Sequence, residues 1–138
     1  MMLLLAGLFA GCALIIIATA RPLIGRRVAP NRIYGLKLKA TFADEWVWYE
    51  ANAASGRDFL KWGYAQLAAV VLPLAVLRPA SWTTSDLDRV GVVYMAINFA
   101  VLMTGLLFVS FIGWMRANRL LAERMAAGME LKPKPPGL

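Results

Sequence analysis

The chain has 138 residues, of which 60% are hydrophobic and 17% are charged, with 15 Lys and Arg against 8 Asp and Glu. It is too apolar to be disordered, and too apolar at this length to bury its hydrophobic residues in one soluble core. The length excludes two sizeable domains. The net charge of +7 is compatible with a nucleic acid or a membrane as partner, and the distribution of the apolar residues decides between them.

Three stretches contain no charged residue, at 1–20, 62–77 and 90–115. A helix needs about 20 apolar residues to cross a bilayer core, within a range of about 17 to 25. The second stretch is shorter than that, but the flanking lysine and arginine can extend their charges into the headgroups. We therefore predict an all-α membrane protein, a single domain over 1–138. Its three transmembrane helices would lie at about 1–20, 60–78 and 90–115, with a buried or re-entrant second segment as the alternative.

The basic residues predict the orientation of these helices. Of the 15 Lys and Arg, 13 lie either between the first and second charge-free stretches or after the third. The positive-inside rule then places both regions in the cytoplasm, so the N-terminus is outside and the C-terminus is inside. Anionic lipids of the inner leaflet account for the excess charge, and we expect no nucleic acid partner. The first stretch lacks the positive n-region of a signal peptide, so we expect a retained span.

The first cytoplasmic loop carries turn signals followed by the pattern of a short helix. Asn31 after a proline predicts a turn, and Gly35 suits a positive φ angle. Thr41 as N-cap, with Asp44 three residues later, predicts an interfacial amphipathic helix at about 41–56. Its predicted apolar face comprises Phe42, Trp46, Tyr49 and Ala53, and Gly56 would end the helix. The helix either binds a partner or ligand or serves as an anchor at the membrane interface between two spans.

Several positions in this loop form an ordered pattern. They are Pro30-Asn31, Gly35-Leu36-Lys37, Thr41, Trp48-Tyr49, Asn52, Gly56-Arg57 and Gly63. The pattern covers about a quarter of the chain and resembles the conserved region of SdpI-family membrane proteins. That family usually has Arg followed by Thr where this chain has Lys37-Leu38, and lysine lacks the bidentate fork of arginine.

The resemblance implies a function without catalysis. The founding member of the family protects a toxin-producing bacterium from its own secreted peptide toxin, and it also signals by holding a repressor at the membrane. The resemblance therefore implies an immunity or signalling protein of the bacterial inner membrane, with a toxin or another membrane protein as partner. The candidate contact residues are Asn31, Gly35, Lys37, Trp48 and Asn52. The alternative is a structural accessory subunit that packs against a larger complex through its spans, basic loop and tail.

Small and polar residues in the spans are candidates for helix packing. Gly7 and Gly11 form a Gly-x-x-x-Gly pair that allows close approach of another helix, either the third span near Gly105 or another protein. Asn98 can form a hydrogen bond to a neighbouring helix, which is worth about 0.6–2 kcal/mol. The single cysteine, Cys12, is interpreted as a packing residue.

Several function classes are disfavoured by what the spans lack. There is no histidine, and all eight acidic residues lie outside the three charge-free stretches. A proton or ion pathway through the membrane needs ionisable groups there. No pairing of a nucleophile with a base is visible, so we expect no enzyme, metal or cofactor. After the third span, 116–127 should continue the helix, Gly128 should stop it, and the Pro-rich tail at 129–138 should be extended.

Overall fold

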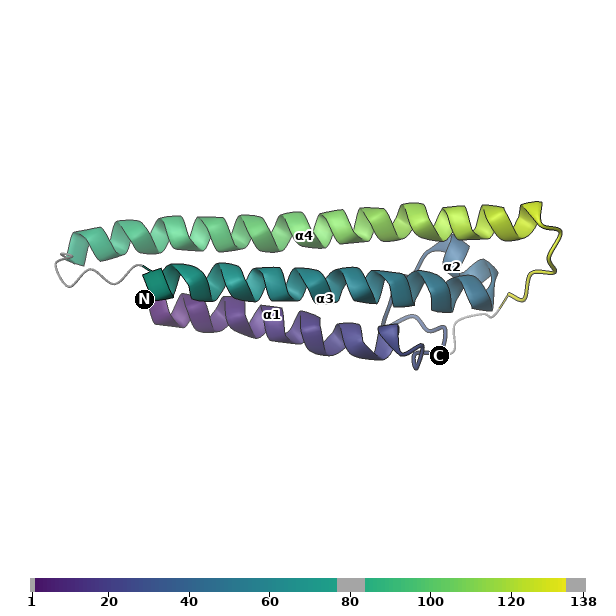
Figure 1. Ribbon diagram of the computed structural model, residues 1–138, viewed down its shortest axis with the longest axis horizontal. Coiled ribbons are helices and arrows are strands. Elements are labelled where there is room, and N and C mark those ends of the chain that lie inside the picture. Colours follow the sequence, from purple (N-terminus) through teal and green to yellow (C-terminus); the bar gives the residue numbers. More distant parts are fainter. Residues whose placement is uncertain (1, 77–83, 134–138) are drawn as a thin grey trace.

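The computed structural model describes residues 2–76 and 84–133. Its elements are the helices α1 (Met2–Ile24), α2 (Lys39–Ala43), α3 (Glu45–Val76) and α4 (Thr84–Ala126). Helix α3 lies between α1 and α4 and runs antiparallel to both (Figure 1). As a result, α2, the start of α3 and the end of α4 share one end of the molecule, which we call the loop end. The far end of the predicted second span and residues 134–138 of the predicted tail lie outside the described residues.

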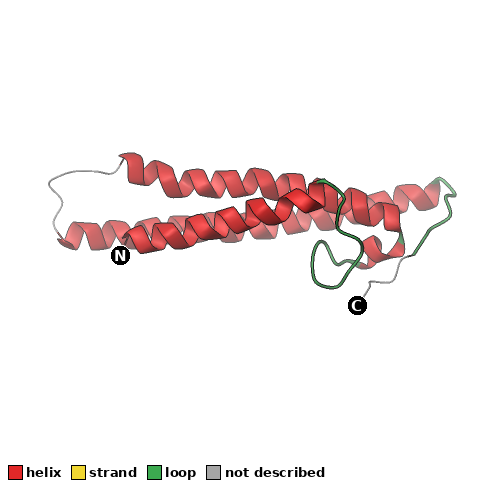
Figure 2. Cartoon of the chain, turned by 90° about the horizontal axis from the view of Figure 1, so that it is seen from below, coloured by secondary structure: helices red, strands yellow, loops and turns green. Residues whose placement is uncertain are grey.

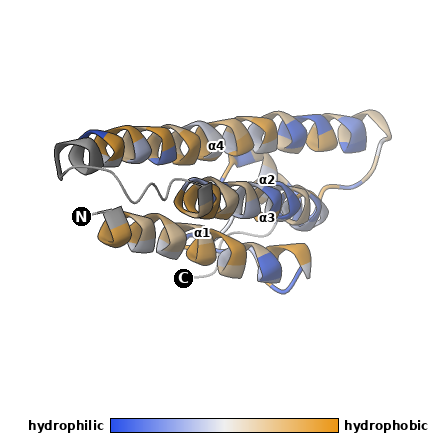
Figure 3. Cartoon of the chain, turned by 60° about the vertical axis from the view of Figure 1, so that its left-hand side comes forward, coloured by the Kyte–Doolittle hydropathy of each residue, from blue (hydrophilic) through white to orange (hydrophobic). Residues whose placement is uncertain are grey.

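The hydropathy of the helices agrees with the prediction in part. Among the described residues, Leu3–Ile24 and Arg89–Ala126 are long and apolar enough to cross a membrane, and α3 does not meet the same criterion. Figure 3 shows hydrophobic residues along much of α1 and α4 and hydrophilic residues gathering towards the loop end. The all-helical prediction is confirmed for the described residues, and two of the three predicted spans have the required length and composition.

The predicted separate helix at 41–56 is wrong. Helix α3 continues unbroken from Glu45 to Val76, so the predicted interfacial segment and the second predicted span form one helix. Gly56 lies inside that helix rather than at its end. A Cβ atom at Gly56 would lie 3.0 Å from the carbonyl oxygen of Ala20 and 3.1 Å from Cβ of Leu23. The glycine therefore allows α1 to pack closely on α3, and it does not act as a C-cap.

The predicted start of that helix is also wrong. Thr41 lies within α2, and its hydroxyl accepts a hydrogen bond from the Leu38 amide at 3.0 Å and donates one to the Leu36 carbonyl at 2.7 Å. Asp44 directly precedes α3, and its Oδ1 accepts the amides of Trp46 and Val47 at 3.0 and 3.1 Å. Asp44 is therefore the N-cap of α3, because a short acceptor at this position satisfies amides that have no partner within the helix.

The predicted aromatic face does not match the buried side of the helix. Trp46 is 43% exposed, whereas Trp48 and Asn52 are almost completely buried. The first turns of α3 are surrounded by α1, α2 and α4, so burial extends over most of their circumference. The four predicted residues therefore do not form one continuous face, because Phe42 lies in α2 and Ala53 is buried at 1% exposure.

Close packing of α1 occurs at glycines of α3. A Cβ atom at Gly63 would lie only 2.6 Å from Cγ1 of Ile17, so this α1 residue packs directly against the glycine. Gly7 and Gly11, in contrast, have open space where a Cβ atom would lie. The predicted Gly-x-x-x-Gly pair is therefore not used in the packing of this chain's own described helices. The close packing of α1 occurs instead at Gly56 and Gly63 of α3, which are two helical turns apart.

Gly105 makes room for an aromatic ring between α3 and α4. A Cβ atom at Gly105 would overlap the indole of Trp62, whose Nε1 donates to the Val101 carbonyl at 3.2 Å. Gly105 thus lies at a helix contact, as the sequence predicted, although its partner is α3 rather than the glycine pair of α1.

Polar side chains add further links between α3 and α4. Gln66 Nε2 donates to Asn98 Oδ1 at 3.1 Å, and both residues are fully buried. Farther from the loop end, the Tyr94 hydroxyl donates to the Val70 carbonyl at 3.1 Å. Asn98 therefore lies where the sequence predicted, at a contact between helices.

Helix α4 continues well beyond the third charge-free stretch. It ends at Ala126, and Gly128 follows with a φ angle of +65°. The left-handed conformation suits glycine at a helix end. The predicted continuation and its stop are both confirmed.

Candidate functional site at the loop end

Asn31 shapes the tip of the first loop. Its Oδ1 accepts the amides of Ile33 and Tyr34 at 2.8 and 2.7 Å, and its Nδ2 donates to the Ala29 carbonyl at 2.8 Å. A side-chain amide that closes such a turn fixes the chain direction on both sides of it. Asn31 therefore places Tyr34 towards the helices, while Ile33 is 87% exposed.

Asn52 holds the same loop against α3. Its Oδ1 accepts the Leu36 amide at 2.6 Å, and its Nδ2 donates to the Trp48 carbonyl at 2.9 Å. Gly35 has a φ angle of +102°, and a Cβ atom there would lie only 2.5 Å from Asn52 Oδ1. Both the backbone conformation and the close approach require glycine at this position.

Trp48 forms the second attachment of the loop. Its Nε1 donates to the Val28 carbonyl at 2.8 Å, and its ring stacks on Phe42 with the ring centroids 5.2 Å apart. The side chain has no exposed surface. Four of the five candidate contact residues thus lie in one arrangement that fixes the loop, because Asn31, Trp48 and Asn52 form side-chain hydrogen bonds and Gly35 allows the close approach to Asn52. Lys37, the fifth, is exposed and lies outside that arrangement.

A pocket of about 290 Å³ lies beneath the loop. Its lining comes from α1, the loop, α3 and α4, and comprises Ile16, Thr19, Ala20, Leu23, Tyr34, Gly35, Leu36, Asn52, Ser55, Phe59, Leu106 and Ser110. Most of the lining is apolar. The polar groups on it are hydroxyls and one amide, so the pocket suits an uncharged or weakly polar group that can accept or donate hydrogen bonds.

Two buried hydroxyls in this pocket lack hydrogen bonds. Ser55 is 1% exposed, and neither its Oγ nor the Tyr34 hydroxyl has a hydrogen-bond partner. Burial raises the pKa of Tyr34, and the Thr19 hydroxyl, which lies near the phenol but outside hydrogen-bonding geometry, lowers it by less, so the phenol stays protonated at neutral pH. Unsatisfied buried polar atoms are costly, and a ligand group that pairs with them would remove that cost. Sequence reasoning missed both residues, because a serine and a tyrosine near a predicted membrane interface carry no distinguishing pattern.

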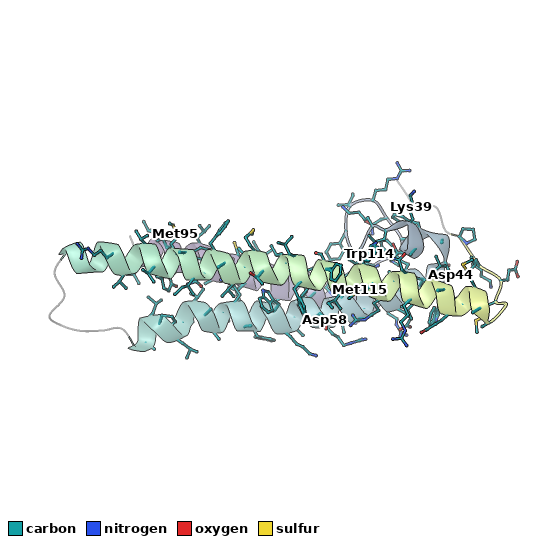
Figure 4. All side chains as sticks on the ribbon, turned by 90° about the horizontal axis from the view of Figure 1, so that it is seen from above. Lys39, Asp44, Asp58, Met95, Trp114 and Met115 are labelled. Atoms are coloured by element: carbon teal, nitrogen blue, oxygen red, sulfur yellow. The ribbon has the colours of Figure 1, made fainter. Side chains whose placement is uncertain are left out.

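Asp44 connects the start of α3 to the C-terminal segment. Besides capping α3, its Oδ2 accepts the Lys132 amide at 3.1 Å, and the Glu45 amide donates to the Lys132 carbonyl at 3.0 Å. Arg124 lies 3.3 Å from the carboxylate and stacks over the Trp46 ring at 5.2 Å. Figures 2 and 4 show the segment after α4 returning towards α2, with Asp44 at this junction.

The surroundings of Asp44 favour its charged form. Burial alone would raise the pKa of Asp44, but the amides of Lys132, Val47 and Trp46 and the charge of Arg124 more than offset it. The pKa of Asp44 therefore lies below its usual 3.8. The carboxylate is charged at neutral pH although it is only 1% exposed.

Ion pairs also connect the helices at the loop end. Arg26 after α1 pairs with Glu50 of α3, and Arg116 of α4 donates to Asp58 of α3 at 2.8 Å. In the described part of the chain, no group of three or more His, Cys, Asp or Glu side chains is arranged to hold a metal ion.

Comparison with known proteins gives one family. The family model described as the SdpI/YfhL protein family matches residues 27–115, which cover the loop, α2, α3 and most of α4. No curated protein and no solved structure matches the chain. The matched region contains the loop pattern and the two glycines that receive α1. The chain is a membrane protein that belongs to the SdpI/YfhL protein family.

Proposed function

We propose that the chain is a non-enzymatic immunity or signalling protein whose loop-end pocket binds its partner. One observation carries the proposal: Asn31, Gly35, Trp48 and Asn52 cooperate in fixing the loop above a pocket with two unsatisfied hydroxyls. A loop held at this many points is preorganised, which lowers the entropic cost of binding. The partner is a peptide toxin at the membrane or a second membrane protein.

In this proposal α1, α3 and α4 each cross the bacterial inner membrane, with the loop end in the cytoplasm. The charge-free stretch 62–77 within α3 and the concentration of basic residues at the loop end support it. The antiparallel course of the helices is what three successive crossings require. The pocket then lies at the cytoplasmic boundary of the membrane.

The test is protection of a bacterium that is killed by the secreted peptide toxin against which the founding family member protects. The wild-type chain should restore growth, whereas Tyr34→Phe combined with Ser55→Ala should reduce protection at an equal protein level in the membrane. These changes remove two hydroxyls and leave the shape of the pocket, so the fold is retained. Tyr64→Phe is the matched control, because Tyr64 is 52% exposed and does not line the pocket.

Two results would refute the immunity proposal or its residues. A wild-type chain that is present in the membrane but gives no protection contradicts the immunity function. Protection that survives Asn31→Ala combined with Trp48→Ala removes the assignment of the loop as the contact site.

A second function is favoured by the outer face of α1. Gly7 and Gly11 have open space beside them, and Leu4 and Leu8 nearby are 81% and 62% exposed. A face of this kind allows close packing of another transmembrane helix, as an accessory subunit of a larger complex requires. Purification in mild detergent distinguishes the two functions. A partner that co-purifies in a stoichiometric amount with the wild-type chain, and is lost from Gly11→Leu, supports the accessory subunit. A wild-type chain that migrates alone contradicts it.

A further inference from the structure

A groove of about 400 Å³ lies between α3 and α4, separate from the pocket beneath the loop. Most of its wall is apolar, from Trp62 and Ala65 on α3 and from Phe108 and Ile112 on α4. On α4 the lining runs from Arg116, at the charged end of the groove, to Phe108, which is about two helical turns away. This depth suits the first part of an acyl chain.

The charged end of the groove opens into a second hollow, of about 390 Å³, with polar walls. Asp58, Lys61 and Arg116 line both spaces, and Glu50 and Arg57 line the second alone. The two hollows therefore meet at a set of ionised side chains. An apolar space joined to a charged one matches the two parts of a phospholipid, whose acyl chain and phosphate are adjacent.

The charges in the second hollow favour an anion. Asp58 is paired with Arg116 at 2.8 Å, and Glu50 is paired with Arg26. Arg57 and Lys61 have no ion pair within the described part of the chain. Two unpaired cations on adjacent turns of α3 can contact a phosphate together, and Arg116, held in place by Asp58, lies beside them.

The position along the helices places this end at the membrane boundary. Lys61 directly precedes the charge-free stretch of α3, and Arg116 directly follows that of α4. Figure 4 shows Asp58 on α3 beneath the neighbouring part of α4. The indole of Trp62 lies at the same level, where tryptophan is favoured at the interface between acyl chains and headgroups.

We propose that this groove is a binding site for one anionic phospholipid. Its phosphate contacts Arg57 and Lys61, and one acyl chain lies against Trp62, Ala65 and Phe108. A zwitterionic lipid binds less well, because its cationic headgroup meets the same two cations. The site is distinct from the loop-end pocket, so its loss leaves the partner site intact.

The headgroup part of the proposal is tested by native mass spectrometry of the full chain released from detergent. The probes are phosphatidylglycerol and phosphatidylcholine with identical acyl chains. The wild-type chain should retain one phosphatidylglycerol in preference to phosphatidylcholine. Arg57→Gln combined with Lys61→Gln should weaken phosphatidylglycerol binding by about tenfold or more. Arg27→Gln combined with Arg32→Gln is the control, because it removes the same charge from the loop.

The acyl part is tested by filling the groove without changing its charge. Ala65→Trp should prevent retention of phosphatidylglycerol, whereas Ala68→Trp, on an exposed position of the same helix outside the groove, should not. A monodisperse elution profile for each variant establishes that it is folded. Equal binding of the two lipids by the wild-type chain overturns the proposal. The proposal is also overturned if the Arg57/Lys61 variant and the Arg27/Arg32 variant bind phosphatidylglycerol equally well. Retention by Ala65→Trp equally contradicts it.

Discussion

Asp44 Oδ1 lies 3.3 Å from Nε of Arg124, so an ion pair joins the start of α3 to the last turn of α4. The carboxylate is almost fully buried, and its remaining acceptor positions are filled by backbone amides of α3 and of Lys132. Charge-assisted hydrogen bonds of this kind are stronger than neutral ones. Asp44 therefore holds together three segments that are distant in the sequence.

The substitution Asp44→Asn separates the two tasks of this residue. Asparagine is as good an N-cap as aspartate, so α3 should keep its start. The ion pair to Arg124 is lost, and an amide nitrogen cannot accept the Lys132 amide. Hydrogen exchange measured by mass spectrometry should therefore accelerate at 129–132 and at Glu45, with little change at Val47. Unchanged exchange at 129–132 would show that Asp44 does not hold the C-terminal segment.

The pH dependence of the same contact follows from the lowered pKa of Asp44. A group whose pKa is lower in the folded state stabilises that state above its unfolded pKa, and the stabilisation disappears as the pH falls through the folded pKa. Attachment of the C-terminal segment should thus be constant from pH 7 down to about 4 and then weaken. Hydrogen exchange at 129–132, corrected for its intrinsic pH dependence, measures this. Asp44→Asn should lack the transition.

Substitution of Gly105 tests the packing of α3 on α4. A methyl group at Gly105 would overlap the Trp62 indole, so Gly105→Ala must displace the ring and break its bond to Val101. We expect a loss of about 1–3 kcal/mol, since overpacking in a well-packed contact typically costs this much. Gly11→Ala is the matched control, because nothing lies near its Cβ position. The thermal unfolding midpoint in detergent should fall for the first variant alone, and equal midpoints would contradict this packing.

Gly35 and Asn52 should act as one unit. Gly35→Ala puts a Cβ atom against Asn52 Oδ1 and strains a φ angle of +102°, and Asn52→Ala removes the acceptor of the Leu36 amide. Each change should loosen the same loop, so their effects on stability should not add, with a coupling of about 0.5–3 kcal/mol. Unfolding of both single variants and the double variant measures the coupling. Additive effects would show that the loop is held elsewhere.

The pair of Gln66 and Asn98 should respond differently to single and double substitution. Asn98→Leu leaves Gln66 without its partner in a buried position, which should cost about 1–2 kcal/mol. Replacing both residues by leucine removes both polar groups, so the double variant should be more stable than Asn98→Leu alone. Thermal unfolding in detergent compares them. A double variant less stable than the single variant would argue against this hydrogen bond.

The sequence alone predicted the features that depend on local chemistry. The Asn31 turn, the positive φ angle at Gly35, the continuation of α4 and its end at Gly128 follow from short-range preferences, and the structure confirms them. Asn98 was predicted at a helix contact because a polar side chain in an apolar helix needs a partner.

The errors concern features that depend on the neighbours of a helix. Glycine is common at helix ends, yet Gly56 lies inside the long helix α3, where α1 packs against it. Gly7 and Gly11 have the spacing of a packing motif, but among the described residues no other helix approaches their Cβ positions. Trp48 and Asn52, which the sequence predicts as contact residues, also hold the loop in place. Spacing predicts where close contact is possible, and the tertiary arrangement decides where it occurs.

The most direct test of the account is the number of membrane crossings, measured by cysteine labelling in spheroplasts. In a Cys12→Ala background, single cysteines replace Lys37, Met129 and Ser81, which lies between α3 and α4 in the sequence. A membrane-impermeant maleimide should label Ser81→Cys in intact spheroplasts, and Lys37→Cys and Met129→Cys only after permeabilisation. Labelling of Ser81→Cys and Lys37→Cys from the same side would show that α3 does not cross the membrane, and would contradict the account.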